Sequence, residues 1–208
     1  NQHADFLVAG GGLAGATAIK TLLSAGVPGT RIALVSAEHE VPYHRPPLSK
    51  GYFLGRESKA SLFVKPRSFY EQAGVRLILG TSVSAVNANA HTVTTDRFGT
   101  IRYGKLLLAT GCVLRRLTVP GSDLHGIFYL RTLADSDALK NEARPGRTAV
   151  VMGGSFIGME LASGFAQKGL KTTLLHRGSA VFDKLGSPEA STFFARHYTE
   201  RGVLLRME

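Results

Sequence analysis

The same spacing of glycines occurs twice in this chain, each time between an apolar run and a stretch with the composition of a helix. In the first copy, the run FLVA at 6–9 leads into GGGLAG, which places Gly10, Gly12 and Gly15 in a G-x-G-x-x-G pattern. Gly10 allows a tight turn, Gly12 lets a pyrophosphate approach the backbone, and Gly15 lets helix and strand pack closely. The following helix offers N–H groups and a positive dipole end to phosphate. The pattern predicts a dinucleotide-binding unit.

The second copy is GGSFIG at 153–158, inside a strand-turn-helix-strand pattern that runs over 148–176. The first copy has further support, because RIALVS at 31–36 reads as the next strand and Glu38 lies about 20 residues beyond the turn. Two such units predict an α/β fold that binds two dinucleotides. The alternative is one ligand and a second copy that is only structural.

The composition argues against a membrane-spanning protein, a disulfide-stabilised protein and a cysteine-based metalloprotein. The chain has 208 residues and no apolar run long enough to span a membrane, and its first residues do not form a signal peptide. Its single cysteine, Cys112, excludes a disulfide within the chain and a cysteine-based metal cluster. We expect Cys112 to be a small buried residue, and the seven histidines show no metal-ligand spacing. A reducing, cytoplasmic location fits this cysteine content.

The formal net charge is +10, and the excess is divided evenly between the two halves of the chain. Whole-protein charge indicates partners and not fold. An acidic protein partner, nucleic acid or an ordinary solvated surface could each explain it. The absence of a basic stripe with interleaved aromatic residues counts against nucleic acid.

Between the two units the sequence has mixed character. VRLILGTSVSAVNANAHTVTT at 75–95 is rich in β-formers, and KLLLATGC at 105–112 reads as a buried strand. We find no low-complexity linker, so the boundary between the units should lie within 105–147. The segment VPYHRPPLSKGY at 41–52 holds three prolines, which exclude a helix interior and a central strand.

The stretches GGGLAG, PYHRPPLSK, TSV, LLLATG, YLRTLADSDAL and GGSFIGMELA, in this order, carry a resemblance. The chain resembles the FAD-dependent pyridine-nucleotide oxidoreductases, in the branch of ferredoxin, putidaredoxin and rubredoxin reductases and apoptosis-inducing-factor-like flavoproteins. The resemblance implies two Rossmann-like units of the glutathione-reductase (GR) type, each built of three layers, ββα. They are an FAD-binding domain at 1–112 and a partial NAD(P)H-binding domain at 113–208. Members of the family continue further, so we expect this chain to be an N-terminal part that does not turn over alone.

The resemblance also implies roles for individual residues. Lys50 would bring its ammonium to the flavin, Arg45 would help to hold the FAD phosphates, and Glu160 would lie beside the nicotinamide. Lys50 and Glu160 are the expected catalytic residues. Alternatively, the loop with Arg45 and Lys50 is only a basic surface loop, and Glu160 is an ordinary helical carboxylate. The expected FAD-binding residues are Gly10, Gly12, Ala14, Gly15, Glu38, Arg45, Pro46, Lys50, Val83, Ala109, Thr110, Gly111 and Arg131, and those for the nicotinamide nucleotide are Gly153, Ser155, Phe156, Ile157, Gly158, Glu160, His176 and Arg177, with no metal ligand.

The chain departs from the family pattern at three places. Ala37 occupies the slot of the first ribose-binding acid, and we expect Glu38 to substitute. Ser155 replaces the middle glycine of the second fingerprint. His176 and Arg177 follow the second strand without an acid, so Arg177, helped by His176 or Lys184, could hold a 2′-phosphate. This favours NADPH over NADH, or tolerance of both; alternatively Arg177 is only solvated.

A single cysteine excludes the redox cysteine pair of the disulfide reductases. The resemblance then implies hydride transfer from NAD(P)H to FAD, with electrons passed to a small acidic iron–sulfur protein of the ferredoxin or rubredoxin type. A signalling or nucleic-acid-binding flavoprotein and a non-catalytic nucleotide-binding module are the alternatives. Neither the electron acceptor nor the oligomeric state follows from the sequence.

Overall fold

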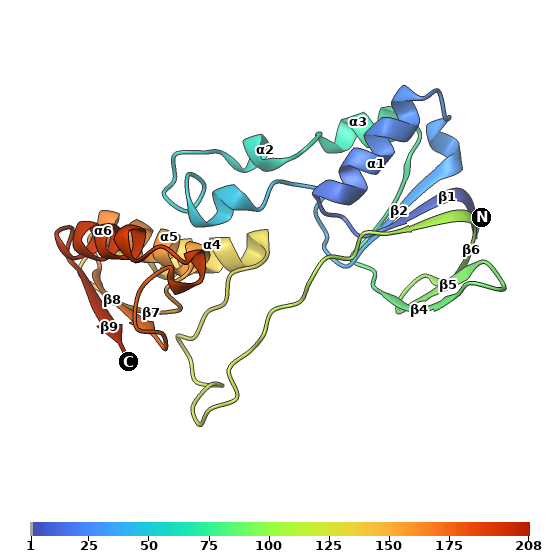
Figure 1. The fold of residues 1–208 in the computed structure, drawn as a ribbon. Helices are drawn as coiled ribbons and strands as arrows, with labels where there is room; N and C mark the ends of the chain where they lie inside the picture. The colour runs from blue at the N-terminus through green and yellow to red at the C-terminus, as the bar shows by residue number, and fades with distance from the viewer. Residues whose placement is uncertain (1) are drawn as a thin grey trace. The chain divides into compact units, whose positions relative to one another are not determined.

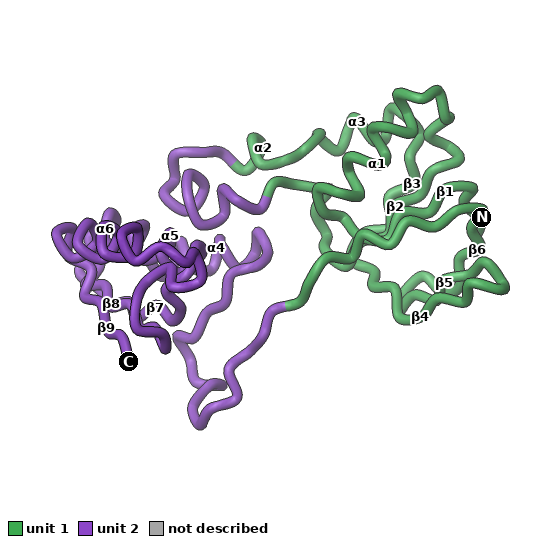
Figure 2. The backbone as a smooth tube through the Cα atoms, viewed as in Figure 1, with its two compact units in different colours: residues 1–44, 59–113 green, residues 45–58, 114–208 purple. Residues whose placement is uncertain are grey.

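The computed structural model describes residues 2–208 and divides the chain into two compact units. Unit 1 contains the chain through His44 together with Lys59–Val113, and unit 2 contains Arg45–Ser58 and Leu114–Glu208 (Figure 2). Each unit holds one of the two glycine-rich turns. No helix of the described chain is both long and apolar enough to cross a membrane.

Unit 1 is built on a six-stranded sheet in the order β3-β2-β1-β6-β5-β4. The parallel part contains β1 (His3–Ala9), β2 (Ile32–Ser36) and β3 (Arg76–Leu79). All five residues of β2 are buried, as expected for a central parallel strand covered on both faces.

The antiparallel part of unit 1 contains β4 (Val83–Asn87), β5 (Thr92–Thr95) and β6 (Gly99–Leu108). The long strand β6 joins the two parts, because its start pairs with β5 and the rest runs parallel to β1.

Helices cover one face of the unit 1 sheet, and the antiparallel strands fold over the other (Figure 1). The covering helices are α1 (Leu13–Ser24) and α3 (Arg67–Gln72), and unit 1 also contains the short helix α2 (Lys59–Leu62) and a short 3₁₀ turn, η1 (Gly29–Arg31). On the helical side Ile19, Leu34 and Tyr70 are fully buried, and on the other side Val93 and Ile101 pack against the parallel strands. Unit 1 therefore has the expected three ββα layers.

Unit 2 contains a parallel sheet in the order β7-β8-β9, with β7 (Thr148–Met152), β8 (Lys171–His176) and β9 (Val203–Met207). The helices α4 (Leu133–Glu142), α5 (Phe156–Gln167) and α6 (Pro188–Thr199) lie on one face of this sheet (Figure 1). The short turn η3 (Asp183–Leu185) precedes α6. The strand-helix-strand order confirms the α/β class and the second Rossmann-like unit.

The proline segment 45–58 is part of unit 2, although it lies within the predicted domain 1–112. It forms the 3₁₀ turn η2 (Pro46–Ser49), whose Leu48 carbonyl accepts a hydrogen bond from Ser136 Oγ at 2.8 Å. Phe53 is fully buried and packs edge-on against Phe165, with ring centroids 5.2 Å apart. These contacts hold the segment against α4 and α5.

Candidate functional site

The first glycine-rich turn connects β1 to α1, and two of its glycines are required by the backbone. Gly10 has a φ of +122°, and a Cβ atom there would lie 2.1 Å from the Ala109 carbonyl oxygen. A Cβ atom on Gly15 would lie 2.1 Å from the Gly10 carbonyl oxygen. The Gly10 N–H donates to Val35 O at 2.8 Å, which ties the turn to β2. Any larger residue at Gly10 or Gly15 would break the turn.

Gly12 differs from the other two glycines. It is the N-cap of α1 in an extended conformation, with no side-chain cap, and a Cβ atom there would meet no atom within 4 Å. Ala14, in the first turn of the helix, is exposed. The backbone at Gly12 therefore faces open space at a helix N-terminus, which is the environment that suits a phosphate.

The second turn repeats this construction between β7 and α5. Gly153 has a φ of +116°, and its N–H donates to Leu175 O at 2.8 Å. A Cβ atom on Gly158 would lie 1.9 Å from the Gly153 carbonyl oxygen. Ser155 occupies the place of Gly12, as an extended N-cap whose side chain makes no cap hydrogen bond. Both residues that follow it, Phe156 and Ile157, are exposed.

The residues at the end of β2 gather around the predicted ribose acceptor, Glu38. The Glu38 N–H donates to Ser36 Oγ at 3.3 Å, and the Tyr43 hydroxyl donates to the Glu38 carboxylate. Ser36 in turn lies against Gly11, where a Cβ atom would come within 2.4 Å of its Oγ. Glu38 is thus held at the carboxyl end of β2, next to the glycine turn, while Ala37 is exposed.

At the end of β8, His176 takes the position against Gly154 that Ser36 takes against Gly11. Its Nδ1 accepts the Gly154 N–H at 3.1 Å, and its Nε2 lies 3.3 Å from Asp183 Oδ2. Arg177, the next residue, is exposed. Both ring nitrogens of His176 are therefore engaged within the protein.

The two predicted catalytic residues are in contact within unit 2. Lys50 Nζ lies 3.0 Å from Glu160 Oε1, and Ser49 Oγ donates to the other Glu160 oxygen. The Lys50 side chain is 52% exposed and the Glu160 side chain 25%, so the pair is accessible to a ligand. Burial raises the pKa of the Tyr198 hydroxyl, and the negative charge of Glu160 adds to this effect.

Arg45 and Arg131 are also joined, because Arg45 Nη1 donates to the Arg131 carbonyl at 2.6 Å. The Arg131 N–H is bound by Asp135, whose carboxylate closes a capping box at the start of α4. Pro46 begins the turn η2 that carries Lys50. Four of the residues expected to hold FAD, namely Arg45, Pro46, Lys50 and Arg131, therefore belong to unit 2.

The remaining expected FAD residues lie in unit 1. Ala109 and Thr110 lie against Gly10, and the Ala109 N–H donates to Ala9 O at 2.7 Å. Gly111 has a φ of +71° and follows them in the chain. Val83 starts β4 and packs on the core of unit 1.

Two expectations were wrong. Cys112 is exposed and not buried, and the segment 105–112 is not a buried strand, because β6 ends at Leu108 and both Leu107 and Leu108 are exposed. The chain has no regular secondary structure from 109 to 118, because it leaves the sheet at the end of β6. Two further residues at these sites, Ser49 and Asp183, were not predicted. Ser49 could have been noticed as a hydroxyl next to Lys50, whereas Asp183 carries no motif of its own.

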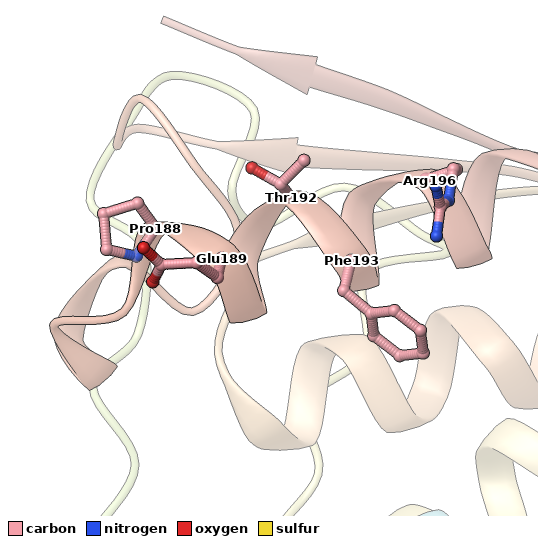
Figure 3. Close-up of a pocket in the computed structure, with 5 residues that line it drawn as sticks. All are labelled: Pro188, Glu189, Thr192, Phe193 and Arg196. Atoms are coloured by element: carbon pink, nitrogen blue, oxygen red, sulfur yellow. The ribbon is translucent and has the colours of Figure 1, made fainter.

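Outside these groups, a pocket on α6 is lined by Pro188, Glu189, Thr192, Phe193 and Arg196 (Figure 3). It contains none of the predicted site residues. Among residues 2–208 there is no group of three or more His, Cys, Asp or Glu side chains that could hold a metal ion.

Curated proteins and solved structures similar to this chain are known. The chain is 38% identical over 205 residues to the 5,5′-dehydrodivanillate O-demethylase ferredoxin reductase subunit of Sphingobium sp., covering 99% of this chain and 50% of the relative. It is 32% identical to rubredoxin-NAD(+) reductase of Pseudomonas putida, covering 95% of this chain and 51% of the relative. The chain spans about half the length of the curated relatives it matches.

Among solved structures, the ferredoxin reductase for the CYP199A2 system from Rhodopseudomonas palustris matches with a TM-score of 0.91 and 33% identity, over 100% of this chain and 50% of that one. Putidaredoxin reductase in its covalent complex with putidaredoxin matches with a TM-score of 0.90 and 30% identity, over the same shares. The model of one family, described as pyridine nucleotide-disulphide oxidoreductase, matches residues 4–208. With both glycine turns inside that match, the chain belongs to the pyridine nucleotide-disulphide oxidoreductase family.

Proposed function

We propose that this chain is the nucleotide-binding part of a flavoprotein reductase that takes electrons from NAD(P)H and passes them to a ferredoxin- or rubredoxin-type protein. The observation that carries the proposal is the repetition of one glycine turn in two units, position by position. Gly10 and Gly153 have the same left-handed backbone and the same hydrogen bond to the neighbouring strand, and Gly15 and Gly158 fill the same close contact. Two turns of this kind suit two dinucleotides.

The residues of unit 1 fit FAD. The open space at Gly12 and the uncapped N-terminus of α1 suit a pyrophosphate, and Glu38 supplies a fixed carboxylate for ribose hydroxyls. Ala109 and Thr110 close the side of the turn at Gly10. We assign the domains accordingly: 1–112 to FAD, with 45–58 packed on unit 2, and 113–208 to the nicotinamide nucleotide.

FAD, when bound, accepts hydride from a nicotinamide and can release electrons one at a time. In this proposal the side chains of the protein bind the two nucleotides and orient the flavin and the nicotinamide. Lys50 would present a fixed positive charge to the flavin, and Glu160 holds that ammonium in place at 3.0 Å. Ser49 donates to the second oxygen of Glu160, so the carboxylate is fixed from two sides. A cation fixed in this way favours a negatively charged, reduced flavin.

The net charge of +10 supports an acidic iron–sulfur protein as the acceptor, because charge complementarity speeds encounter. Two relatives described above are named for ferredoxin and for rubredoxin. We also propose a cytoplasmic location, on the cysteine content alone.

The test is the visible spectrum of the protein that carries this chain, recorded without oxygen after NADH or NADPH is added. We expect a bound flavin that either nucleotide bleaches rapidly. A bound flavin that neither nucleotide bleaches would overturn the reductase and leave a binding role. Electron delivery to ferredoxin should also slow as salt is added, since salt screens the attraction between the two proteins.

A further inference from the structure

The end of β8 lacks the carboxylate that normally receives the adenosine ribose, because His176 and Arg177 stand there and neither is an acid. Because Nδ1 of His176 accepts the Gly154 N–H, the ring carries its proton on Nε2 and donates it towards Asp183 Oδ2, 3.3 Å away. A chain of hydrogen bonds thus runs from the glycine turn through the imidazole to the carboxylate of Asp183.

The loop that carries Asp183 is fixed by an unusual residue. Phe182 has a φ of +55°, which is a rare and costly conformation for an aromatic residue. Its N–H donates to Gly154 O at 2.8 Å, and its buried ring packs between Phe156 and Phe194. Both the backbone and the side chain of Phe182 therefore attach this loop to the glycine turn. The strained backbone of Phe182 sets the direction in which Asp183 leaves the loop.

A glycine makes room for this carboxylate. A Cβ atom on Gly178 would lie 2.2 Å from Asp183 Oδ2 and 2.7 Å from His176 Nε2. Asp183 itself is 36% exposed, so it can still accept hydrogen bonds from a ligand.

We propose that Asp183 replaces the missing strand-end acid as the acceptor for the adenosine ribose hydroxyls, so that unit 2 prefers NADH to NADPH. The inference rests on the proposed function, since it needs a nicotinamide nucleotide on this turn. A carboxylate accepts two ribose hydroxyls and repels a 2′-phosphate. The expectation of NADPH rested on the absence of a carboxylate, and Asp183 supplies one from the loop after the strand.

Two cationic side chains near Asp183 in the sequence determine how removal of its carboxylate should change nucleotide binding. Arg177 and Lys184 are exposed neighbours of His176 and Asp183 in the chain. With Asp183 ionised, their charge is partly offset; without it, they are free to hold a 2′-phosphate. Asp183 therefore acts as the residue that selects between the two nucleotides.

The test is calorimetric binding of ADP-ribose and of 2′-phospho-ADP-ribose to this chain. We expect the unmodified chain to bind ADP-ribose at least about tenfold more tightly than the phosphorylated form, as a hydrogen bond to a charged acceptor allows. Asp183→Asn keeps an acceptor for His176 and removes only the charge, and Asp183→Ala removes both the acceptor and the charge. Each should weaken ADP-ribose binding and tighten binding of the phosphorylated form, and Arg177→Ser added to Asp183→Asn should reduce that gain, because only Lys184 then remains to hold the 2′-phosphate.

Glu200→Gln is the matched control, because it removes one exposed carboxylate of unit 2 at the end of α6. It should leave both affinities unchanged. Equal binding of the two probes, or a preference that Asp183→Asn does not change, would overturn this inference and leave the proposed function standing. If a chain with native circular dichroism bound neither probe, the proposed function would fail, and this inference with it.

Discussion

Lys50 Nζ lies 3.0 Å from Glu160 Oε1, and the two residues come from segments that the sequence assigns to different domains. The contact exists because the proline segment that carries Lys50 packs on α4 and α5 through Leu48 and Phe53. Glu160 orients the ammonium and offsets part of its charge. Lys50 is therefore a cation whose position depends on unit 2.

Replacing Lys50 with methionine should slow reduction of bound flavin by NAD(P)H about tenfold to a hundredfold, because the fixed positive charge that favours reduced flavin is lost. Rapid-mixing absorbance without oxygen, on the protein that carries this chain, measures the rate. Lys171→Met is the matched control, since Lys171 is an exposed lysine at the start of β8. An unchanged rate in Lys50→Met would mean that Lys50 is only part of a basic loop.

The three glycines of the first turn should respond differently to alanine. At Gly12 a Cβ atom meets nothing within 4 Å, so Gly12→Ala should change the free energy of unfolding by less than about 1 kcal/mol. It should still weaken FAD binding, because the methyl group occupies the space of the pyrophosphate. Gly15→Ala should lower the free energy of unfolding by about 2 kcal/mol, because its Cβ atom would meet a backbone oxygen at 2.1 Å.

Urea unfolding of this chain and FAD titration by fluorescence separate these effects. A chain with Gly12→Ala that is stable and binds FAD with full affinity would show that the turn does not hold the pyrophosphate.

The two glycine turns could be predicted residue by residue because their constraint is local. The positive φ of Gly10 and Gly153 belongs to the backbone of each turn, and the carbonyl oxygens of these two residues exclude a side chain at Gly15 and Gly158. The strand-turn-helix order around them follows from the same short stretch of sequence.

The partner of the proline segment could not be predicted, because it depends on contacts between residues distant in sequence, such as Phe53 with Phe165. Asp183 was missed for a similar reason: a loop, turned by the strained backbone of Phe182, supplies the carboxylate expected at the end of the strand. Burial of Cys112 was expected from the average behaviour of cysteine, but the chain has already left the sheet there.

Ser155 should limit nucleotide affinity in the second turn. It stands where Gly12 stands in the first, and its side chain makes no cap hydrogen bond that would be lost on removal. Ser155→Gly should therefore bind ADP-ribose more tightly, by less than about tenfold, because the pyrophosphate can approach the backbone more closely. Calorimetric titration measures the change, and weaker binding would indicate that the hydroxyl contacts the ligand.

Cys112 should report on FAD without any activity measurement. Since its side chain is exposed, Ellman's reagent should label the native chain with one equivalent, and Cys112→Ser should not react. FAD should slow the reaction, because Ala109, Thr110 and Gly111 just before it are expected to border the cofactor. Labelling at the same rate with saturating FAD would place the cofactor elsewhere.

Tyr70 should lower the stability of the protein at high pH. Its side chain is fully buried on the helical side of unit 1, and its hydroxyl has no hydrogen-bond partner within the described chain. Burial raises the pKa of Tyr70 from 10.0 to about 12. Between these two values the unfolded chain loses the proton while the folded chain keeps it, so the free energy of unfolding falls as the pH rises.

Tyr70→Phe removes both the unpaired hydroxyl and its titration. We expect it to stabilise the chain by about 1 kcal/mol at neutral pH, because an unsatisfied buried donor is lost while the ring packing stays. The advantage over the unmodified chain should grow between pH 9 and pH 11, measured by urea unfolding, since all other groups titrate alike in both proteins. A difference that stays constant over this range would show that Tyr70 titrates in the folded chain as it does in the unfolded chain.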